Sequence, residues 1–317
     1  MPVQYSGYAV PRADLGEAFH EFQPDQNFIA EQIFPVRGVM KKAASLSVIT
    51  RKNLKRSDTK HANGAAFARI GLDAKDMDYK CVSEGLEYPL TNEDRENYAS
   101  DFDAEVEGVQ VLKLKMLLER ECRVKDLVFN TTTWTGTPLY TDVSGSIPFA
   151  TAGSAIIPVI TAAKEKSRLL TGVTPDTLIL GEALVLQILA NTTIKACFPG
   201  ATLITQEMLR QALPGIFDLN QLIVGNAVYD SAKEGRAFSG SDIWGSTYAM
   251  VAKVQKGATN INAGLGRSIV WTPMDNGVDS IIQYREEQTD SDIFRGQGFR
   301  QEKVFDTAFA HLLKVNV

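Results

Sequence analysis

The longest regular pattern in the chain is a helical one that begins just after Pro89. Thr91 can cap its first turn, and Glu93 and Asp94 place negative charge at the positive end of a helix dipole. No proline interrupts the run before Asn130. Apolar residues recur close to the 3.6-residue helical period at Tyr98, Phe102, Val106, Val109, Leu112, Met116, Val124 and Leu127. We therefore expect one uninterrupted helix of roughly 35 residues, about 50 Å long.

A coiled-coil or bundle helix would show a similar recurrence of apolar residues. That interpretation requires a sustained heptad, which is missing, and a second helix of matching length, which does not follow Asn130. It is therefore the weaker alternative for this segment.

Beyond Asn130, helical stretches alternate with short apolar runs. Ala155 to Leu170 has a helical pattern, Thr177 to Gly181 is typical of a buried strand, and Glu182 to Ala190 is helical again. Further expected elements are a short helix from Thr205 to Pro214-Gly215, a core strand at 222–224, a strand from Tyr248 to Lys253, and a last strand within Asp306 to Val317. No repeat and no linker rich in Gly, Pro or Ser divides the chain. The pattern predicts an α+β fold with two interleaved lobes.

Composition narrows the class of protein. The 317 residues are 44% hydrophobic and carry a net charge of −5, which is typical of a folded globular chain. No basic region followed by an apolar core opens the sequence, and no apolar run approaches ~18 residues. We therefore expect neither export nor a membrane span, and synthesis in a cytosol. The three cysteines are widely spaced, which argues against a disulfide framework and against a zinc site.

Two segments of opposite charge lie before the predicted helix, and the second of them extends into its start. Residues 37–60 contain eight basic side chains against the single acid Asp58: Arg37, Lys41, Lys42, Arg51, Lys52, Lys55, Arg56 and Lys60. Residues 73–107 contain twelve acids against Lys75, Lys80 and Arg95: Asp73, Asp76, Asp78, Glu84, Glu87, Glu93, Asp94, Glu96, Asp101, Asp103, Glu105 and Glu107. The two segments are therefore electrostatically complementary.

The basic segment has three possible roles. Nucleic-acid binding is one, but no aromatic residues are interleaved to stack on bases, and residues 45–50 alternate like a β-strand. A solvated surface hairpin is the second. The third is a two-stranded arm, spanning 37–88 with little contact to its own lobes, that lies on the acidic face of a neighbouring copy. The candidate inter-subunit contacts are then Arg51, Lys52, Lys55 and Arg56 on the arm, and Glu93, Asp94, Asp101 and Glu105 on the helix.

Residue types that carry catalysis do not form a recognisable set. The three histidines, His20, His61 and His311, are not spaced as in a zinc protease. Neither a Gly-x-Ser-x-Gly elbow nor a Gly-Lys-Ser/Thr phosphate loop occurs. Gly264-Leu265-Gly266 lacks the third glycine of a dinucleotide fingerprint, so we interpret it as a turn.

A calcium-binding loop is also not supported. Asp101, Asp103 and Glu105 have part of the required spacing, but Val106 and Leu112 stand where glycine and the last acid are needed. We interpret these carboxylates as a solvated helix face. The sequence therefore predicts a protein that is not an enzyme, with no catalytic residues, no cofactor and no metal.

The order of these features resembles that of a known family. The features are a short N-terminal arm, the basic hairpin, the Glu84-Gly85-x-x-Tyr88-Pro89-Leu90 entry, the helix with Arg120-Glu121-x-Arg123 near its end, the run from Thr171 to Gly181, Val224-Gly225-x-Ala227-x-Tyr229, and Ile243-Trp244-Gly245. This order is similar to that of the major capsid proteins of tailed double-stranded DNA bacteriophages, which have the Hong Kong 97-like fold. The resemblance covers about residues 28–317, and the order and spacing of short motifs carry it.

The resemblance implies five parts of the chain. They are an N-terminal arm at 1–36, an extended E-loop at 37–90, a P-domain with a spine helix at 91–137, an A-domain at 138–266, and a return to the P-domain at 267–317.

A function follows from the same resemblance. It implies a structural protein that assembles as hexamers and pentamers into an icosahedral shell around double-stranded DNA, without sequence-specific DNA binding. Partners would be other copies of the chain, a separate scaffolding protein, a portal and a decoration protein. The location would be the virion, after assembly in the host cytoplasm. Lys52, Lys55 and Lys60 lie in the loop that some members crosslink covalently, but no motif identifies reactive residues here.

Two alternatives remain. An encapsulin-type nanocompartment would use the same fold around a protein cargo, although the long basic arm favours a virus. A cytosolic α/β enzyme with an unrecognised site is the other.

Overall fold

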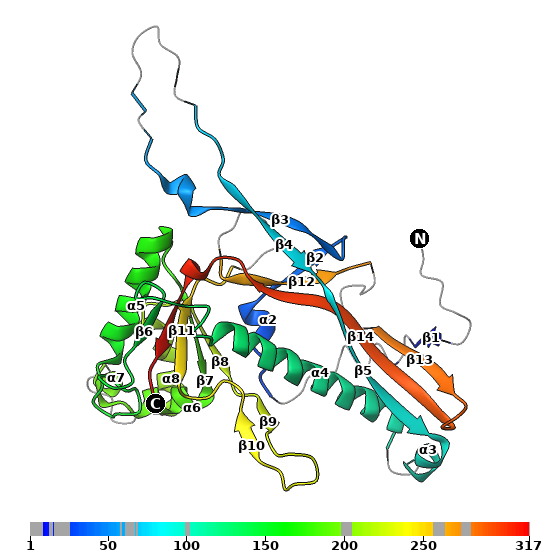
Figure 1. Cartoon of the computed structure of the whole chain (residues 1–317). Helices are drawn as coiled ribbons and strands as arrows, with labels where there is room; N and C mark the ends of the chain where they lie inside the picture. The colour runs from blue at the N-terminus through cyan, green and yellow to red at the C-terminus, as the bar shows by residue number, and fades with distance from the viewer. Residues whose placement is uncertain are drawn as a thin grey trace.

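The fold is α+β, as the sequence predicts. The computed structural model describes residues 9–12, 15, 26–57, 59–60, 67, 69–98, 102–197, 205–255, 264–273 and 280–316. Figure 1 shows two sheets and a long helix in one body, with a two-stranded arm that extends away from it. No helix in the described segments is long and apolar enough to cross a membrane.

The first sheet packs one face against the long helix α4 (Ala104–Val128). Its strands follow the order β1 (Ala9–Pro11), β13 (Ser280–Glu286), β14 (Ser291–Val304), β12 (Gly266–Trp271) and β2 (Val36–Val39), and β5 (Val82–Thr91) also pairs with β14. All pairs are antiparallel except β2 with β12. Helix and sheet lie close together, because a Cβ at Gly296 would stand 2.4 Å from Leu112 Cδ2.

The second sheet is covered on both faces. Its strands follow the order β6 (Tyr140–Asp142), β15 (Ala310–Lys314), β11 (Tyr248–Ala252), β7 (Thr177–Gly181) and β8 (Gln221–Gly225). One face packs on α5 (Ile156–Thr171), α6 (Glu182–Ala190), α7 (Thr192–Lys195) and α8 (Gln206–Ile216), and the other on α2 (Ala30–Ile33) and the end of α4.

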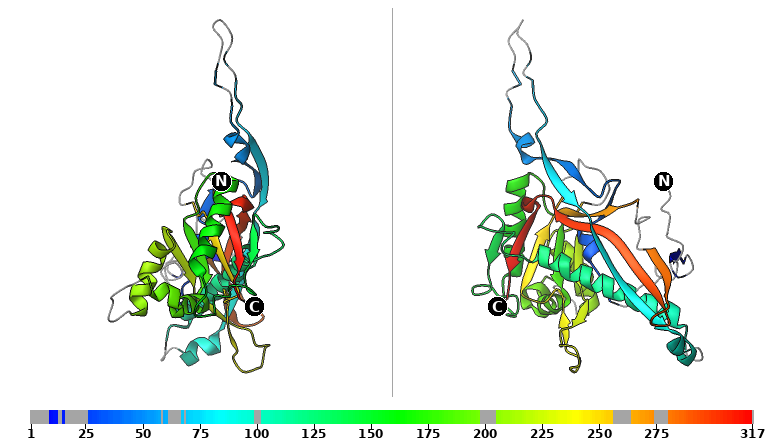
Figure 2. Two further views of the ribbon diagram at one scale, coloured as in Figure 1. Left: turned by 90° about the vertical axis from the view of Figure 1, so that its left-hand side faces the viewer. Right: turned by 45° about the vertical axis from the view of Figure 1, so that its right-hand side comes forward.

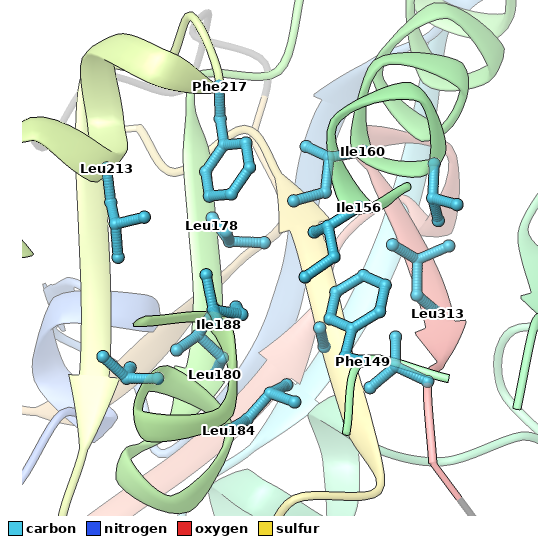
Figure 3. Close-up of a cluster of buried hydrophobic side chains, with 14 of the residues drawn as sticks. Phe149, Ile156, Ile160, Leu178, Leu180, Leu184, Ile188, Leu213, Phe217 and Leu313 are labelled. Atoms are coloured by element: carbon cyan, nitrogen blue, oxygen red, sulfur yellow. The ribbon is translucent and has the colours of Figure 1, made fainter. Parts of the chain in front are cut away.

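Strand β7 shows why its run of apolar residues is continuous. Leu178 and Leu180 point to the helical side, where they join Ile156, Ile160 and Phe149 in the cluster of Figure 3. Ile179 points to the opposite side and belongs to the cluster with α2 and α4. A strand that is buried on both faces needs apolar residues at every position, rather than at alternate ones.

The predicted single helix from Thr91 to Asn130 is wrong in its continuity. Two helices occupy the segment, α3 (Asn92–Tyr98) and α4, and α4 begins only at Ala104. The side chain of Asp103 accepts hydrogen bonds from the amides of Glu105 and Val106, so it starts a new helix as an N-cap. Asp103, which we expected on a solvated helix face, is therefore the N-cap of α4. With 25 residues, α4 is about 37 Å long.

The start of α3 agrees with the sequence. Thr91 Oγ1 accepts a hydrogen bond from the amide of Asp94 at 3.1 Å, so the predicted cap at Thr91 is confirmed. Pro89 does not end the extended segment, because β5 continues through it to Thr91. It lies opposite Ile293 of β14.

Most elements predicted beyond Asn130 are confirmed. The bounds of β7 and α6 match the prediction, and α5, β8, β11 and β15 occur in the predicted segments. Thr205 caps α8 through the amide of Met208. However, α8 continues through Pro214 and Gly215 to Ile216, and the Pro214 carbonyl accepts a hydrogen bond from the Leu219 amide. A 3-10 turn, η2 (Thr307–Phe309), precedes β15.

The last strand differs from the expected return of 267–317 to the spine-helix region. Strands β12, β13 and β14 do lie in the sheet beside α4, but β15 joins the second sheet between β6 and β11. Its residues Ala310 to Leu313 are buried, which suits a central strand rather than an edge. The domain boundaries themselves remain a prediction.

The arm is the antiparallel pair of β3 (Ala43–Ile49) and β4 (Ala74–Lys80), and it continues outward through the 3-10 turn η1 (Arg51–Leu54). Figures 1 and 2 show that it extends far from both sheets. The expectation that all of 37–88 is detached is wrong at both ends. Strand β2 pairs with β12 up to Val39, and β5 pairs with β14 from Val82 onward. A second ribbon, β9 (Val228–Asp230) with β10 (Gly240–Asp242), extends from the opposite side of the body.

Candidate assembly surfaces

The basic side chains predicted as arm contacts divide into two pairs. Arg51 Nε lies 3.1 Å from Asp306 Oδ2, and Lys52 Nζ lies 3.5 Å from Asp73 Oδ2. Lys55 and Arg56 are exposed. Two of the four candidates therefore have acidic partners within their own chain.

Asp73 also fixes the start of η1. Thr50 Oγ1 donates a hydrogen bond to Asp73 Oδ1 at 2.5 Å, and this bond, together with the nearby Lys52, lowers the pKa of Asp73. Asn53 Nδ2 donates to the Asp73 carbonyl at 2.8 Å. The two limbs of the arm are thus joined beyond the end of the β3–β4 pairing.

The outer part of the arm also carries large apolar side chains, which the sequence reasoning missed. Leu54, Phe67, Ile70 and Leu72 are 65%, 73%, 83% and 74% exposed. A groove of about 1020 Å³ lies between the limbs and is lined by Lys52, Asn53, Lys55, Ser57, Thr59, Arg69, Ile70, Gly71, Leu72 and Asp73. The signal was present as three large apolar residues, at positions 67, 70 and 72, in a stretch that otherwise consists of small and polar residues. An exposed apolar group of this kind marks an interaction surface.

The base of the arm is anchored by an aromatic cluster. Tyr79 and Phe299 are buried together with Val39, Cys81 and Ile269. The Tyr79 hydroxyl donates to the Lys41 carbonyl at 3.0 Å, and burial raises the pKa of Tyr79. Lys42 Nζ lies 5.1 Å from the ring centroid of Phe299. The direction in which the arm leaves the body is thus fixed by side chains of the first sheet.

The predicted acidic contacts lie around α3 and the start of α4. Glu93 is exposed, and Asp94 caps α3 together with Thr91. Glu105 lies 3.2 Å from Arg12 Nη2 and 2.7 Å from Arg95 Nη2. Asp101 lies outside the described residues. Arg95 also pairs with Asp292 at 2.7 Å, so Glu105 belongs to a network within the chain.

Two stacked aromatic rings lie beside this acidic corner. The rings of Tyr98 and Phe102 have centroids 4.9 Å apart, and the residues are 40% and 45% exposed. A hollow of about 410 Å³ next to them is lined by Arg95, Phe102, Asp103, Ala104 and Glu105. The arm and this corner lie at opposite ends of the molecule (Figure 1), so a chain does not bring its own basic and acidic candidates together.

The motif Arg120-Glu121-x-Arg123 lies where the two sheets meet. Glu121 is fully buried, and its carboxylate accepts hydrogen bonds from the amides of Ile29 and Ala30 and from Trp244 Nε1 at 2.9, 3.0 and 2.7 Å. Burial raises the pKa of Glu121, against the effect of these three donors. The carboxylate therefore joins α4 to the start of α2 and to the loop before β11.

Of the residues searched for catalysis, His20 and His61 lie outside the described residues, whereas His311 and Gly266 take structural positions. His311 is buried, with Nδ1 2.9 Å from the Pro138 carbonyl and Nε2 2.8 Å from Thr141 Oγ1. Gly266 begins β12, where a Cβ would stand 2.5 Å from the Phe34 ring. Within the described segments, no group of three or more His, Cys, Asp and Glu side chains is placed to hold a metal ion.

One curated sequence relative is a bacteriophage protein. The chain is 26% identical over 226 residues to the major capsid protein of Burkholderia phage BcepMu, which covers 70% of each chain. No family model matches the sequence.

Solved structures share the fold along nearly the whole chain. A phage-related protein from Bordetella bronchiseptica matches with a TM-score of 0.72 and 18% identity, over 96% of this chain and 97% of that one. The capsid of the cyanophage P-SCSP1u matches with a TM-score of 0.59 and 12% identity, over 93% and 90%. An encapsulin complex from Synechococcus elongatus matches with a TM-score of 0.52 and 9% identity, over 90% and 86%.

The structural matches establish the fold, which is the Hong Kong 97-like fold that the order of the sequence motifs implied and which a phage capsid and an encapsulin share. In sequence, the chain is similar to the major capsid protein of a bacteriophage.

Proposed function

We propose that this chain is a tailed-bacteriophage major capsid protein, which assembles as hexamers and pentamers into an icosahedral shell that encloses double-stranded DNA. The observation that carries the proposal is the arm. It extends from the body as an isolated two-stranded ribbon with exposed apolar and basic side chains. An isolated hairpin is marginally stable in water, so an arm of this kind gains its order from neighbouring copies.

Charge supports a specific contact between copies. Arg51, Lys52, Lys55 and Arg56 of one arm would face the acidic corner of a neighbour, formed by Glu93, Asp94, Asp101 and Glu105. The arm and the described part of the acidic corner lie at opposite ends of the molecule, and a head-to-tail contact between unlike surfaces closes a ring where its rotation allows closure. Lys55 and Arg56 would contribute most, because Arg51 and Lys52 already have acidic partners.

The remaining parts of the proposal follow from the family. The chain would be a structural protein without enzymatic activity, assembled in the host cytoplasm with a separate scaffolding protein and a portal, and decorated on its outer face by another protein. The arm and spine-helix regions would correspond to the E-loop at 37–90 and to the P-domain at 91–137 and 267–317, except that β15 joins the second sheet, which would belong to the A-domain at 138–266.

Electron microscopy of the purified full chain tests the proposal. Large closed shells are expected. Small shells filled with a protein cargo would indicate an encapsulin instead, and a small oligomer under all assembly conditions would contradict a capsid role.

A further inference from the structure

A line of alternating charges crosses the molecule at the end of α4. Glu31 Oε1 of α2 lies 2.6 Å from Arg120 Nη1, and Arg120 Nε lies 3.5 Å from Glu302 Oε1 of β14. Glu302 Oε2 lies 3.7 Å from Arg123 Nη2, and that nitrogen lies 2.7 Å from Glu84 Oε2 of β5. The line therefore runs from the N-terminal segment to the strand that continues directly from the arm.

The ion pairs at the two ends of the line are short, and the two contacts at its centre are longer. The outer contacts have hydrogen-bond lengths, whereas the two contacts of Glu302 do not. Arg120 Nε and Nη2, Arg123 Nε and Glu302 Oε1 are buried without a hydrogen-bond partner. The side chains of Arg120 and Glu302 are only 4% and 5% exposed, so water gives them little compensation. Glu302 would gain a proper bond by moving fully toward either arginine.

Nearby charges shift the pKa values of the carboxylates at the two ends of the line. The pKa of Glu84 is raised by burial and by the nearby Glu302, while Arg123 and Arg300 oppose this rise. The pKa of Glu31 is lowered, because Arg120, Arg300 and Lys113 outweigh the partial desolvation of its carboxylate. Glu84 and Glu302 thus compete for Arg123. When Glu84 occupies Arg123, Glu302 is free to pair with Arg120.

We propose that Glu302 is a shared counter-ion that couples the attachment of the N-terminal segment to the strand at the base of the arm. When Glu302 moves toward Arg123, the buried guanidinium of Arg120 loses a partner. Opening the contact between α2 and α4 then becomes less costly, because it lets water reach Arg120. When Arg123 is held by Glu84, Glu302 stays with Arg120 and α2 remains attached.

The helix α2 is a suitable reporter of this coupling. It has only four residues, so its own hydrogen bonds cannot stabilise it and its protection depends on packing against α4. The amides of Ile33 and Phe34 donate to the carbonyls of Ile29 and Ala30 at 3.0 and 2.9 Å. Their hydrogen-exchange rates measure how often α2 opens.

Hydrogen exchange of the full chain, followed in peptides that cover residues 29–34, tests the coupling. Glu84→Gln should accelerate exchange there by about fivefold or more, the low end of usual coupling between sites. In a Glu302→Gln background, the same substitution should leave the rates unchanged. Equal acceleration in both backgrounds, or none in either, would overturn the proposal. Glu182→Gln cuts a pair with Arg210 of similar exposure in the second sheet region, and it should not affect these peptides.

The reverse experiment remains informative if Glu302→Gln fails to fold. Glu31→Gln leaves Arg120 with Glu302 as its carboxylate partner and so draws Glu302 away from Arg123, which should accelerate exchange of the β5 amides at 82–91. The Glu31 side chain is 63% exposed, so this variant is expected to fold. Unchanged exchange in β5 would rule out the shared counter-ion.

Discussion

Gly108 of α4 lies against the ring of Tyr88 in β5 with no room for a side chain between them. A Cβ added at Gly108 would stand 1.9 Å from Tyr88 Cε1, far inside van der Waals contact. Gly108 is buried in the helix interior, where glycine normally weakens a helix relative to alanine. The close approach of α4 to the first sheet therefore depends on this glycine.

Gly108→Ala should destabilise the chain despite the better helix propensity of alanine. The overlap forces the Tyr88 ring or the helix to move, and overpacking of this kind costs about 1–3 kcal/mol. Gly215→Ala in α8 is the matched control, because a Cβ there meets nothing within 4 Å. Denaturant unfolding should show a lower free energy of unfolding for the first variant only, and equal values for both would contradict this packing.

Much of the fold could be predicted from local patterns. Helices α5 and α6 could be predicted from their apolar periodicity, and strand β7 from its continuous run of apolar residues. Each of them buries apolar residues of that pattern in the core. The break before α4 could not be predicted from the apolar stripe, since Phe102 and Val106 keep the helical spacing across it. The side chain of Asp103, which caps the start of α4, marks the break.

Contacts between residues far apart in the sequence, which shape the candidate surfaces, were harder to predict. The charges of the arm were visible in the sequence, but Asp306, the partner of Arg51, and Arg12, one of two partners of Glu105, lie 255 and 93 residues away, and spacing along the chain does not reveal them. The pairing of β5 with β14 joins segments about 200 residues apart, so the ends of the arm could not be located. Exposure of Ile70 and Leu72 depends on an arm that leaves the core, which periodicity does not report.

His311 should make stability depend on pH. Its Nδ1 donates to the Pro138 carbonyl and Nε2 accepts from Thr141 Oγ1, and burial lowers the pKa of the ring from 6.5 to about 4. The unfolded chain is therefore protonated first as pH falls. The contribution of His311 is complete above pH 6.5 and is lost between 6.5 and about 4, by about 3 kcal/mol in total.

His311→Asn checks this assignment, because asparagine retains a donor near the position of Nδ1 but does not titrate. Wild-type chain and variant should be unfolded by denaturant at several pH values from 7.5 to 4. The difference in free energy of unfolding between them should shrink as pH falls through this window. A constant difference at every pH would show that the folded chain tolerates a protonated His311.

The arm should be ordered mainly by neighbouring copies. Backbone amides of residues 43–80 should exchange rapidly in free subunits and slowly in shells, because the β3–β4 pair has no third strand. The amides of β5 provide the internal control, since β5 pairs with β14 in the subunit itself. Equal protection of β3 and β4 in both states would contradict an arm that needs a neighbour.

Reversing the basic charges of the arm should block shell formation. A variant with Arg51, Lys52, Lys55 and Arg56 all changed to Glu places like charges opposite the acidic corner, and exposed pairs are individually worth under ~1 kcal/mol, so several reversals are needed. The smaller variant Lys55→Glu/Arg56→Glu leaves the contacts of Arg51 and Lys52 intact. Both should stay folded by circular dichroism and sediment as free subunits.

A charge-matched control separates this contact from a general effect of net charge. Lys195→Glu/Lys233→Glu changes two exposed lysines, one at the end of α7 and one between β9 and β10, by the same total charge as Lys55→Glu/Arg56→Glu. This variant should assemble normally. Normal shells from the four-residue arm variant would rule out the electrostatic contact. The groove between the limbs of the arm would then be the remaining candidate for docking.

Isolated subunits should bind duplex DNA negligibly at physiological salt. DNA that fills and leaves a shell has to slide along its wall, and a wall that neutralised many phosphates would hold it with an affinity that grows with each released counterion. The net charge is −5, and of the four basic contact candidates on the arm, Arg51 and Lys52 already pair with Asp306 and Asp73. Filter-binding titrations at several salt concentrations decide the question. Weak retention that disappears with salt, and that Lys55→Glu/Arg56→Glu reduces further, is the expected result. Nanomolar, sequence-dependent retention would overturn this prediction and the structural role proposed for the chain, because a protein that recognises DNA sequence needs contacts to base edges that a confining wall does not.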